Sequence, residues 1–184
     1  MRMLCATAVL AIGLVFSASA RAEDDAAPGA SADPAAADAP KEAGRPSEKG
    51  TLGVGLIFGE PTGVSVKLYL EDDQAIQGAF GASFYADAWQ AHAEYIWHPW
   101  ILQDRDTFVL PVYLGPGLRF MRYNGGRSGE ATFAAGLRVV AGLLFDFKNV
   151  PLDVFVEAGG VIEYDFTDGA QPGFNVGAGV RYYF

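Results

Sequence analysis

The feature that most constrains the fold of this chain is a period-two alternation of apolar and polar residues through positions 51–184. It is clearest at residues 173–184, GFNVGAGVRYYF, where every second side chain is apolar and those between are mostly small or polar. Successive side chains of a β-strand point to opposite faces of the sheet. The alternation therefore predicts strands that each have one apolar and one polar face.

The alternation is divided into eight segments by turn-forming residues. The predicted strands are residues 51–59, 63–70, 74–85, 89–98, 107–123, 131–147, 152–164 and 173–184. Glycine and proline mark the turn at residues 60–63, and NGGRSGE at 124–130 reads as a loop. Pro111 and Pro116 lack the N–H that a strand ladder uses, so we expect a bulge or bend there. Short connections between successive strands predict an all-β fold, an eight-stranded antiparallel up-and-down barrel.

The two predicted faces differ strongly in charge. The face that we expect inside the barrel carries Lys67, Glu94, Arg119, Arg138, Asp153, Glu157, Glu163 and Arg181, while the opposite face is almost free of charge. A soluble barrel would place polar residues outside, because eight apolar rows exposed to water would cause aggregation. Strands of roughly ten residues with apolar outer rows are typical of transmembrane barrels. We therefore predict a transmembrane β-barrel.

The first fifty residues differ from the rest. Residues 1–20 have a positive start at Arg2, an apolar stretch at 4–16 and a small-residue site at 18–20, which predict a signal peptide cleaved after Ala20 or Ala22. Residues 21–50 are rich in Ala, Pro and acidic residues, and such a composition predicts a disordered periplasmic segment. The barrel domain is then residues 51–184. The formal net charge of −9, without a basic cluster, argues against nucleic acid as a partner.

Two short motifs resemble a known family. The hairpin G-x-P-T-G-x-S-x-K at residues 59–67 and the end GVRYYF at 179–184 are similar to an uncharacterised family of small bacterial outer-membrane β-barrel proteins. The resemblance covers residues 51–184 and implies an eight-stranded barrel in the outer membrane of a Gram-negative cell, with no assigned enzymatic activity. A final aromatic residue is also similar to the signal read by the barrel-assembly machinery. This similarity implies that the assembly machinery recognises Phe184, Tyr182 and Val180. The partners implied are this machinery and outer-membrane lipid, and we expect a monomer.

The interior charges are open to more than one interpretation. An eight-stranded barrel is just wide enough for side chains to fill, and buried charges must be paired, so a closed, structural and non-enzymatic interior is favoured. A narrow gated path for ions or small solutes is the first alternative. Adhesion or ligand binding through the hairpin of the strands at 107–123 and 131–147 is the second, with no extracellular partner identified.

A lipid-modifying enzyme is the least favoured interpretation. Ser83 is expected to lie level with His92 inside the barrel, but no G-x-S-x-G motif is present. His92, Glu94 and His98 share a face but are spread too far along one strand for a metal site. We therefore predict no catalytic residues, no cofactor and no metal.

Overall fold

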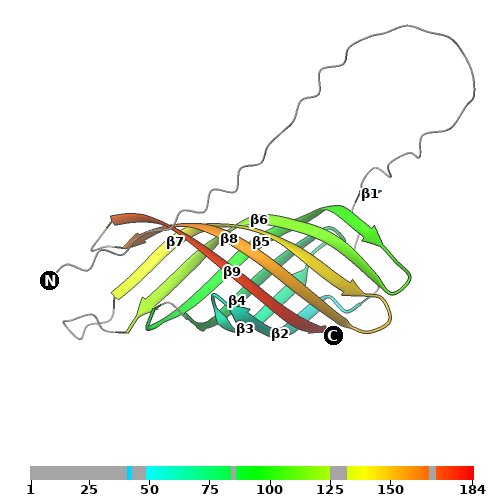
Figure 1. Cartoon of the computed structure of the whole chain (residues 1–184), viewed down its shortest axis with the longest axis horizontal. Coiled ribbons are helices and arrows are strands. Elements are labelled where there is room, and N and C mark those ends of the chain that lie inside the picture. Colours follow the sequence, from blue (N-terminus) through cyan, green and yellow to red (C-terminus); the bar gives the residue numbers. More distant parts are fainter. Residues whose placement is uncertain (1–40, 43–48, 84–85, 125–131, 166–168) are drawn as a thin grey trace, which may run out of the picture. The chain divides into compact units, whose positions relative to one another are not determined.

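Eight strands follow one another along residues 52–183, each antiparallel to the next (Figure 1). They are β2 (Leu52–Gly59), β3 (Thr62–Tyr69), β4 (Gln74–Ala82), β5 (Ala88–Asp104), β6 (Phe108–Tyr123), β7 (Thr132–Phe147), β8 (Leu152–Asp165) and β9 (Gly169–Tyr183). A two-residue strand, β1 (Lys41–Glu42), pairs with Ile101 and Trp100 of β5. The structure is a computed structural model that describes residues 41–42, 49–83, 86–124, 132–165 and 169–184. The predicted signal peptide and most of the predicted disordered segment lie outside these residues.

The sheet closes on itself. Strand β2 pairs with β3 on one side and with the last strand, β9, on the other, where Val54 lies opposite Tyr182. Strand β5 pairs with both β4 and β6, which joins the two remaining edges. The predicted all-β fold with eight antiparallel up-and-down strands is therefore confirmed, and the strands form a ring. None of the described segments is a helix long and apolar enough to cross a membrane.

Two strands are longer than the alternation predicts. Strand β5 continues to Asp104, where we expected an end at residue 98, and β9 begins at Gly169 instead of residue 173. The extension of β5 contains two register shifts against β6, one between Trp97 and Trp100 and one between Ile101 and Gln103, each adding one residue to β5. These bulges let pairing continue beyond Pro99.

The predicted irregularity is confirmed at one of the two prolines in β6. Pro111 lies opposite Ile101, between the two register shifts of β5. Pro116 keeps a regular register with Val139 of β7, so the expected bulge is absent from that ladder. An extra residue on the neighbouring strand thus accommodates the missing N–H at Pro111.

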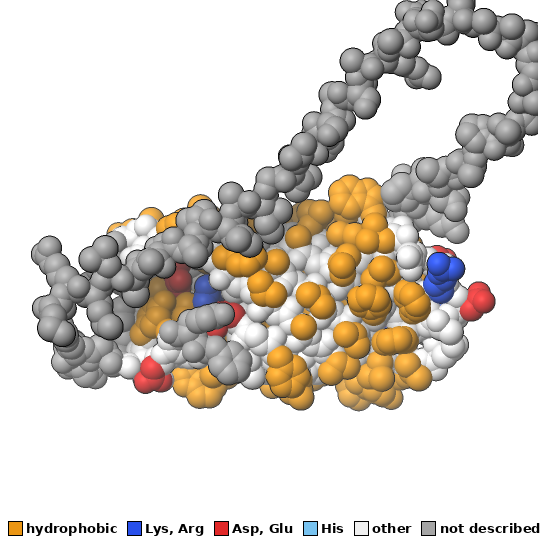
Figure 2. Space-filling model, viewed as in Figure 1, with side chains coloured by type: hydrophobic (Ala, Val, Ile, Leu, Met, Phe, Trp, Pro, Cys, Tyr) orange, Lys and Arg blue, Asp and Glu red, His pale blue; other side chains and the backbone are white. Residues whose placement is uncertain are grey.

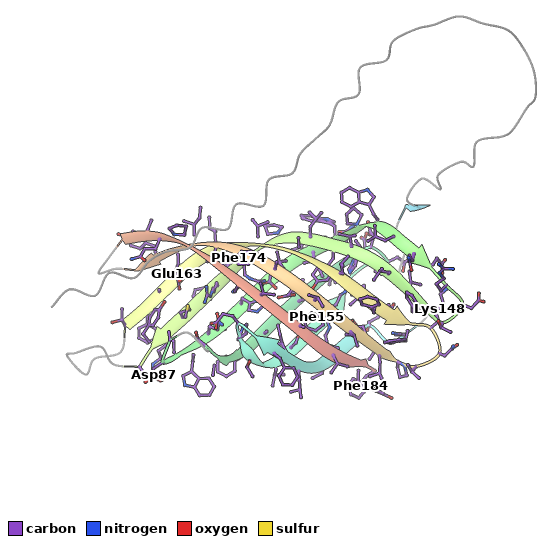
Figure 3. All side chains as sticks on the ribbon, viewed as in Figure 1. Asp87, Lys148, Phe155, Glu163, Phe174 and Phe184 are labelled. Carbon is purple, nitrogen blue, oxygen red and sulfur yellow. The ribbon has the colours of Figure 1, made fainter. Side chains whose placement is uncertain are left out.

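The ring has two ends, which we name by what they carry. The loop end holds the connections β2–β3, β4–β5, β6–β7 and β8–β9, and the terminal end holds the start of β2, the end of β9 and the other turns. Figure 3 shows Asp87 and Glu163 at the loop end, and Lys148 and Phe184 at the terminal end. Residue Gly59, at the loop end of β2, has a φ of 119°, a backbone conformation that favours glycine.

Inside and outside faces follow the alternation. Outward side chains such as Leu137 (67% exposed) and Phe174 (70%) are apolar, and Figure 2 shows apolar groups across the visible face with charged groups toward its two ends. The interior combines apolar residues with many polar ones. Its larger apolar cluster consists of Ile57, Tyr69, Ala75, Ala79, Ile96, Tyr113, Val140, Leu144, Phe155 and Tyr183.

Candidate functional site

The interior polar network is the candidate site, and it contains every charged residue predicted to point inward. Seven of the eight are buried and Glu163 is partly buried. They lie on six strands: Lys67 on β3, Glu94 on β5, Arg119 on β6, Arg138 on β7, Asp153, Glu157 and Glu163 on β8, and Arg181 on β9. On each strand they occupy positions whose side chains point to the same face of the sheet, because successive side chains alternate between the two faces.

Arg138 is the centre of the network. Its guanidinium contacts the Glu94 carboxylate through Nη1 and donates from Nη2 to Glu157 Oε1 at 3.0 Å. Nη1 also lies 3.3 Å from His92 Nδ1, which contacts the same Glu94 oxygen. A Cβ on Gly159 would lie 2.7 Å from Arg138 Nε, so the missing side chain leaves room for the guanidinium. One arginine on β7 therefore bridges β5 and β8.

Glu157 carries the contact that crosses the ring. Its Oε2 accepts hydrogen bonds from Tyr113 Oη at 2.9 Å and from Gln77 Nε2 at 3.0 Å. Gln77 lies on β4 and Glu157 on β8, and three strands separate β4 from β8 in either direction around the ring. The Gln77–Glu157 hydrogen bond therefore spans the interior from one wall to the opposite one.

A second group lies toward the terminal end. Arg181 Nε donates to Asp153 Oδ1 at 3.1 Å, and Tyr183 Oη donates to Asp153 Oδ2 at 2.6 Å. The Arg181 guanidinium carbon lies 4.0 Å from the centroid of the Phe155 ring. Arg181 Nη1 also donates to Gln77 Oε1 at 3.3 Å. Gln77 thus joins the terminal group to the central one.

Lys67 is held by an imidazole and by aromatic faces. Its Nζ lies 2.8 Å from His98 Nε2 and 4.5 Å from the centroid of the Tyr69 ring. His98 Nδ1 lies 3.0 Å from the carbonyl oxygen of Asp73, which can only accept a hydrogen bond. The Nδ1 atom therefore carries the proton, and Nε2 accepts a hydrogen bond from Lys67 Nζ.

A third group of polar residues lies toward the loop end. Arg119 Nε donates to Gln90 Oε1 at 2.8 Å, and Gln90 Nε2 donates to Glu60 Oε1 at 2.5 Å. The Arg119 guanidinium is 3.8 Å from Glu60 and 3.9 Å from Glu163. Both ion pairs are longer than those of the central group.

Sequence reasoning missed several members of the network. Gln77, Gln90, Tyr113, Asp146 and Asn175 occupy inward positions of predicted strands, so their parity could have indicated them. Lys49 was assigned to the disordered segment, but its Nζ contacts the Asp146 carboxylate and the Leu152 carbonyl oxygen at the terminal end. No sequence pattern indicates that contact.

The predicted placement of Ser83 level with His92 is wrong. Ala79 is the β4 residue opposite His92, while the Ser83 N–H donates to the Ala88 carbonyl, nearer the loop end. The prediction assumed a shorter strand connection than the register allows. Within the described part of the chain, no group of three or more His, Cys, Asp and Glu residues is arranged to hold a metal ion.

The proposed assembly signal lies on the outer face of β9 and just beyond it. Phe184, Tyr182 and Val180 form one exposed row, and the Tyr182 and Phe184 rings meet edge to face at 5.0 Å between centroids. The Phe184 N–H donates to the Leu52 carbonyl, which ties the chain end to β2. Recognition of this row by the assembly machinery stays a prediction.

Comparison with known proteins returns no match to any family model, curated protein or solved structure. The resemblance of residues 59–67 and 179–184 to small outer-membrane barrel proteins therefore stays a prediction from those residues.

Proposed function

We propose that this chain is an integral outer-membrane β-barrel protein with a structural, non-enzymatic role and an interior closed by its charge network. The observation that carries the proposal is the contrast between the two faces of the ring. Among the described residues of β2 to β9, the exposed charged side chains are Asp104 and Arg122, each close to one end. The other charged residues of these strands whose side chains the structure describes are buried or partly buried.

An apolar outer band of this kind matches what a lipid bilayer requires. A charged side chain on the lipid face of a barrel costs about 2–4 kcal/mol at the bilayer midplane and little near the interfaces. Aromatic residues on the outer face also lie toward both ends, as in the girdles of membrane barrels. Trp97, Trp100, Tyr182 and Phe184 are exposed toward the terminal end, and Phe58, Phe133 and Tyr164 toward the loop end.

The contacts of Glu157 support a closed interior. A passing ion would have to separate the Gln77–Glu157 hydrogen bond and pass Arg138, whose guanidinium is held between two carboxylates. Breaking a buried ion pair leaves an uncompensated charge and is strongly unfavourable. The network therefore acts as a polar filling that holds opposite walls together.

The membrane assignment is tested by solubility. Mature protein expressed in a Gram-negative host should sediment with the outer membrane and need detergent for extraction. In a non-ionic detergent, its gel mobility should change on heating. Recovery as a monomer in buffer without detergent would contradict the assignment.

One observation favours the second candidate, a narrow path for ions or small solutes. Five buried polar atoms have no hydrogen-bond partner among the described residues: His92 Nε2, Glu94 Oε2, Glu163 Oε1, Asn175 Nδ2 and Arg181 Nη2. Planar bilayer recordings separate the candidates, because a closed interior gives no sustained current and a path gives steady conductance.

Adhesion or ligand binding through the β6–β7 hairpin stays a prediction, because its loop at 125–131 lies outside the described residues.

A further inference from the structure

A groove lies on the outer face of the ring near the loop end, across strands β4 to β7. It encloses about 460 Å³, which lies within the ~300–1,000 Å³ range of ligand sites. Its outward-facing lining residues are Phe80, Trp89, Ala91, Phe120, Arg122 and Phe133.

The register explains why the surface is hollow at this point. Ala91 lies opposite Phe80 on one side and Phe120 on the other, so a small residue separates two large rings. On the β4 side, Phe80 stacks on Trp89 with 5.6 Å between ring centroids. Aromatic side chains therefore flank the groove on both sides, and the methyl group of Ala91 forms its floor.

Arg122 gives the groove a charge. It lies between Trp89 and Phe133 in the register, and its side chain is exposed. It forms no hydrogen bond or ion pair with any other described residue. Together with Asp104, at the other end of the ring, it accounts for the exposed charge on the described residues of β2 to β9. A lone guanidinium beside an apolar groove is complementary to a molecule with an anionic head and an apolar chain.

We propose that this groove binds an anionic lipid of the membrane, with its phosphate group at Arg122 and one acyl chain over Ala91 between Phe80 and Phe120. The inference rests on the proposed membrane location. In that setting Arg122 lies near the interface, where a phosphate group is available and the charge is tolerated. The planar guanidinium forms paired hydrogen bonds to phosphate oxygens, which gives the head group both affinity and orientation.

The test uses Trp89, which lines the groove, as the reporter. The chain has three tryptophans, and the substitutions Trp97→Phe and Trp100→Phe leave Trp89 alone. The protein is reconstituted into phosphatidylcholine vesicles containing brominated-chain phosphatidic acid or, in parallel, brominated-chain phosphatidylcholine. Bromine quenches tryptophan fluorescence at short range. Quenching should indicate an affinity for phosphatidic acid about fivefold higher than for phosphatidylcholine, because the choline cation offsets the phosphate charge in the second lipid and an exposed ion pair contributes a preference of about this size.

Two variants locate the contact, and a third is the control. Arg122→Gln should bring the ratio close to one, whereas Arg105→Gln, an exposed arginine at the terminal end, should leave it unchanged. Ala91→Leu fills the floor while keeping Arg122, and it should lower quenching by phosphatidic acid.

Each other outcome has a distinct meaning. Equal quenching by both lipids in the reporter protein would overturn the anionic-lipid site but leave the membrane assignment intact. Selectivity that survives Arg122→Gln, or quenching by phosphatidic acid that Ala91→Leu leaves unchanged, would also overturn the site. Absence of quenching by either lipid would contradict insertion itself, and with it both proposals.

Discussion

At the residue scale, Glu157 is expected to be the most sensitive position of the interior. Glu157→Ala removes the partner of Arg138 Nη2 and the acceptor of Tyr113 and Gln77. Arg138 is only 1% exposed, so its charge cannot turn to water. Losing one partner of a buried pair costs about 3–5 kcal/mol. Urea unfolding in detergent, followed by tryptophan fluorescence, should show a decrease of this size.

The matched control is Asp72→Ala. Asp72 is an acidic residue exposed in the β3–β4 turn, and its substitution should leave the unfolding midpoint unchanged. Similar losses for both variants would contradict a specific role for the network.

Two adjacent glycines of β8 provide a second test. A Cβ on Gly159 would lie 2.7 Å from both Arg138 Nε and Asn175 Oδ1, while a Cβ on Gly160 would meet nothing within 4 Å. Gly159→Ala should therefore displace the guanidinium and destabilise the protein by about 1–3 kcal/mol, as overpacking usually does. Gly160→Ala should be tolerated. Equal urea midpoints for the two variants would show that the interior adapts to the extra methyl group.

Much of the candidate site could be predicted from the sequence, but its pairing could not. Strand parity alone indicates that Arg138 and Glu157 face inward. The contact between Glu157 and Gln77 forms because ring closure places β4 opposite β8. It also requires the two residues to lie at the same height along the axis of the ring. Neither follows from the pattern within a single strand. Gln77 is neutral, so a search for charged inward residues did not identify it as part of the network.

At the scale of the element, β9 combines two roles on its two faces. Deleting Phe184 should impair insertion in cells more than stability, because the side chain is 71% exposed and its loss removes little packing. We expect less folded protein in outer-membrane fractions and near-normal refolding in detergent. Phe184→Tyr keeps an aromatic end and serves as the control. Equal amounts of folded protein with and without Phe184 would contradict recognition of this residue.

The inner face of the same strand predicts the opposite result. Arg181→Ala leaves Asp153 buried without the donor that lies 3.1 Å away. The variant should still insert, because the exposed row of β9 is intact, but it should unfold at a lower temperature. Heat-modified gel mobility of membrane fractions measures both quantities. Normal thermal stability of this variant would contradict a stabilising role for the pair.

The alternation located the strands well in their central parts and less well at their ends. Strand β5 passes the predicted end at residue 98 because two bulges absorb the effect of Pro99 on its pairing with β6. Bulges depend on the partner strand, so a local pattern does not reveal them. The early start of β9 likewise reflects pairing of Gly169 with Asp165 across the turn.

At the scale of the whole molecule, the even number of strands predicts the direction in which the proposed membrane barrel would be inserted. Eight strands bring the start of β2 and the end of β9 to the same end of the ring. In outer-membrane barrels the short turns are periplasmic and the longer loops extracellular. We therefore expect the terminal end in the periplasm and the loop end outside the cell.

Cysteine labelling of cells tests this direction, because Cys5 is the only cysteine in the chain and Cys5→Ser removes it. In that background, Asp87→Cys places a thiol at the loop end and Asp106→Cys places one in the β5–β6 turn at the terminal end; both positions are exposed. A membrane-impermeant maleimide should label the first variant in intact cells and the second only after the outer membrane is permeabilised. The reverse pattern would show that the barrel is inserted the other way round. In that case the groove at Arg122 would lie in the inner leaflet of the membrane.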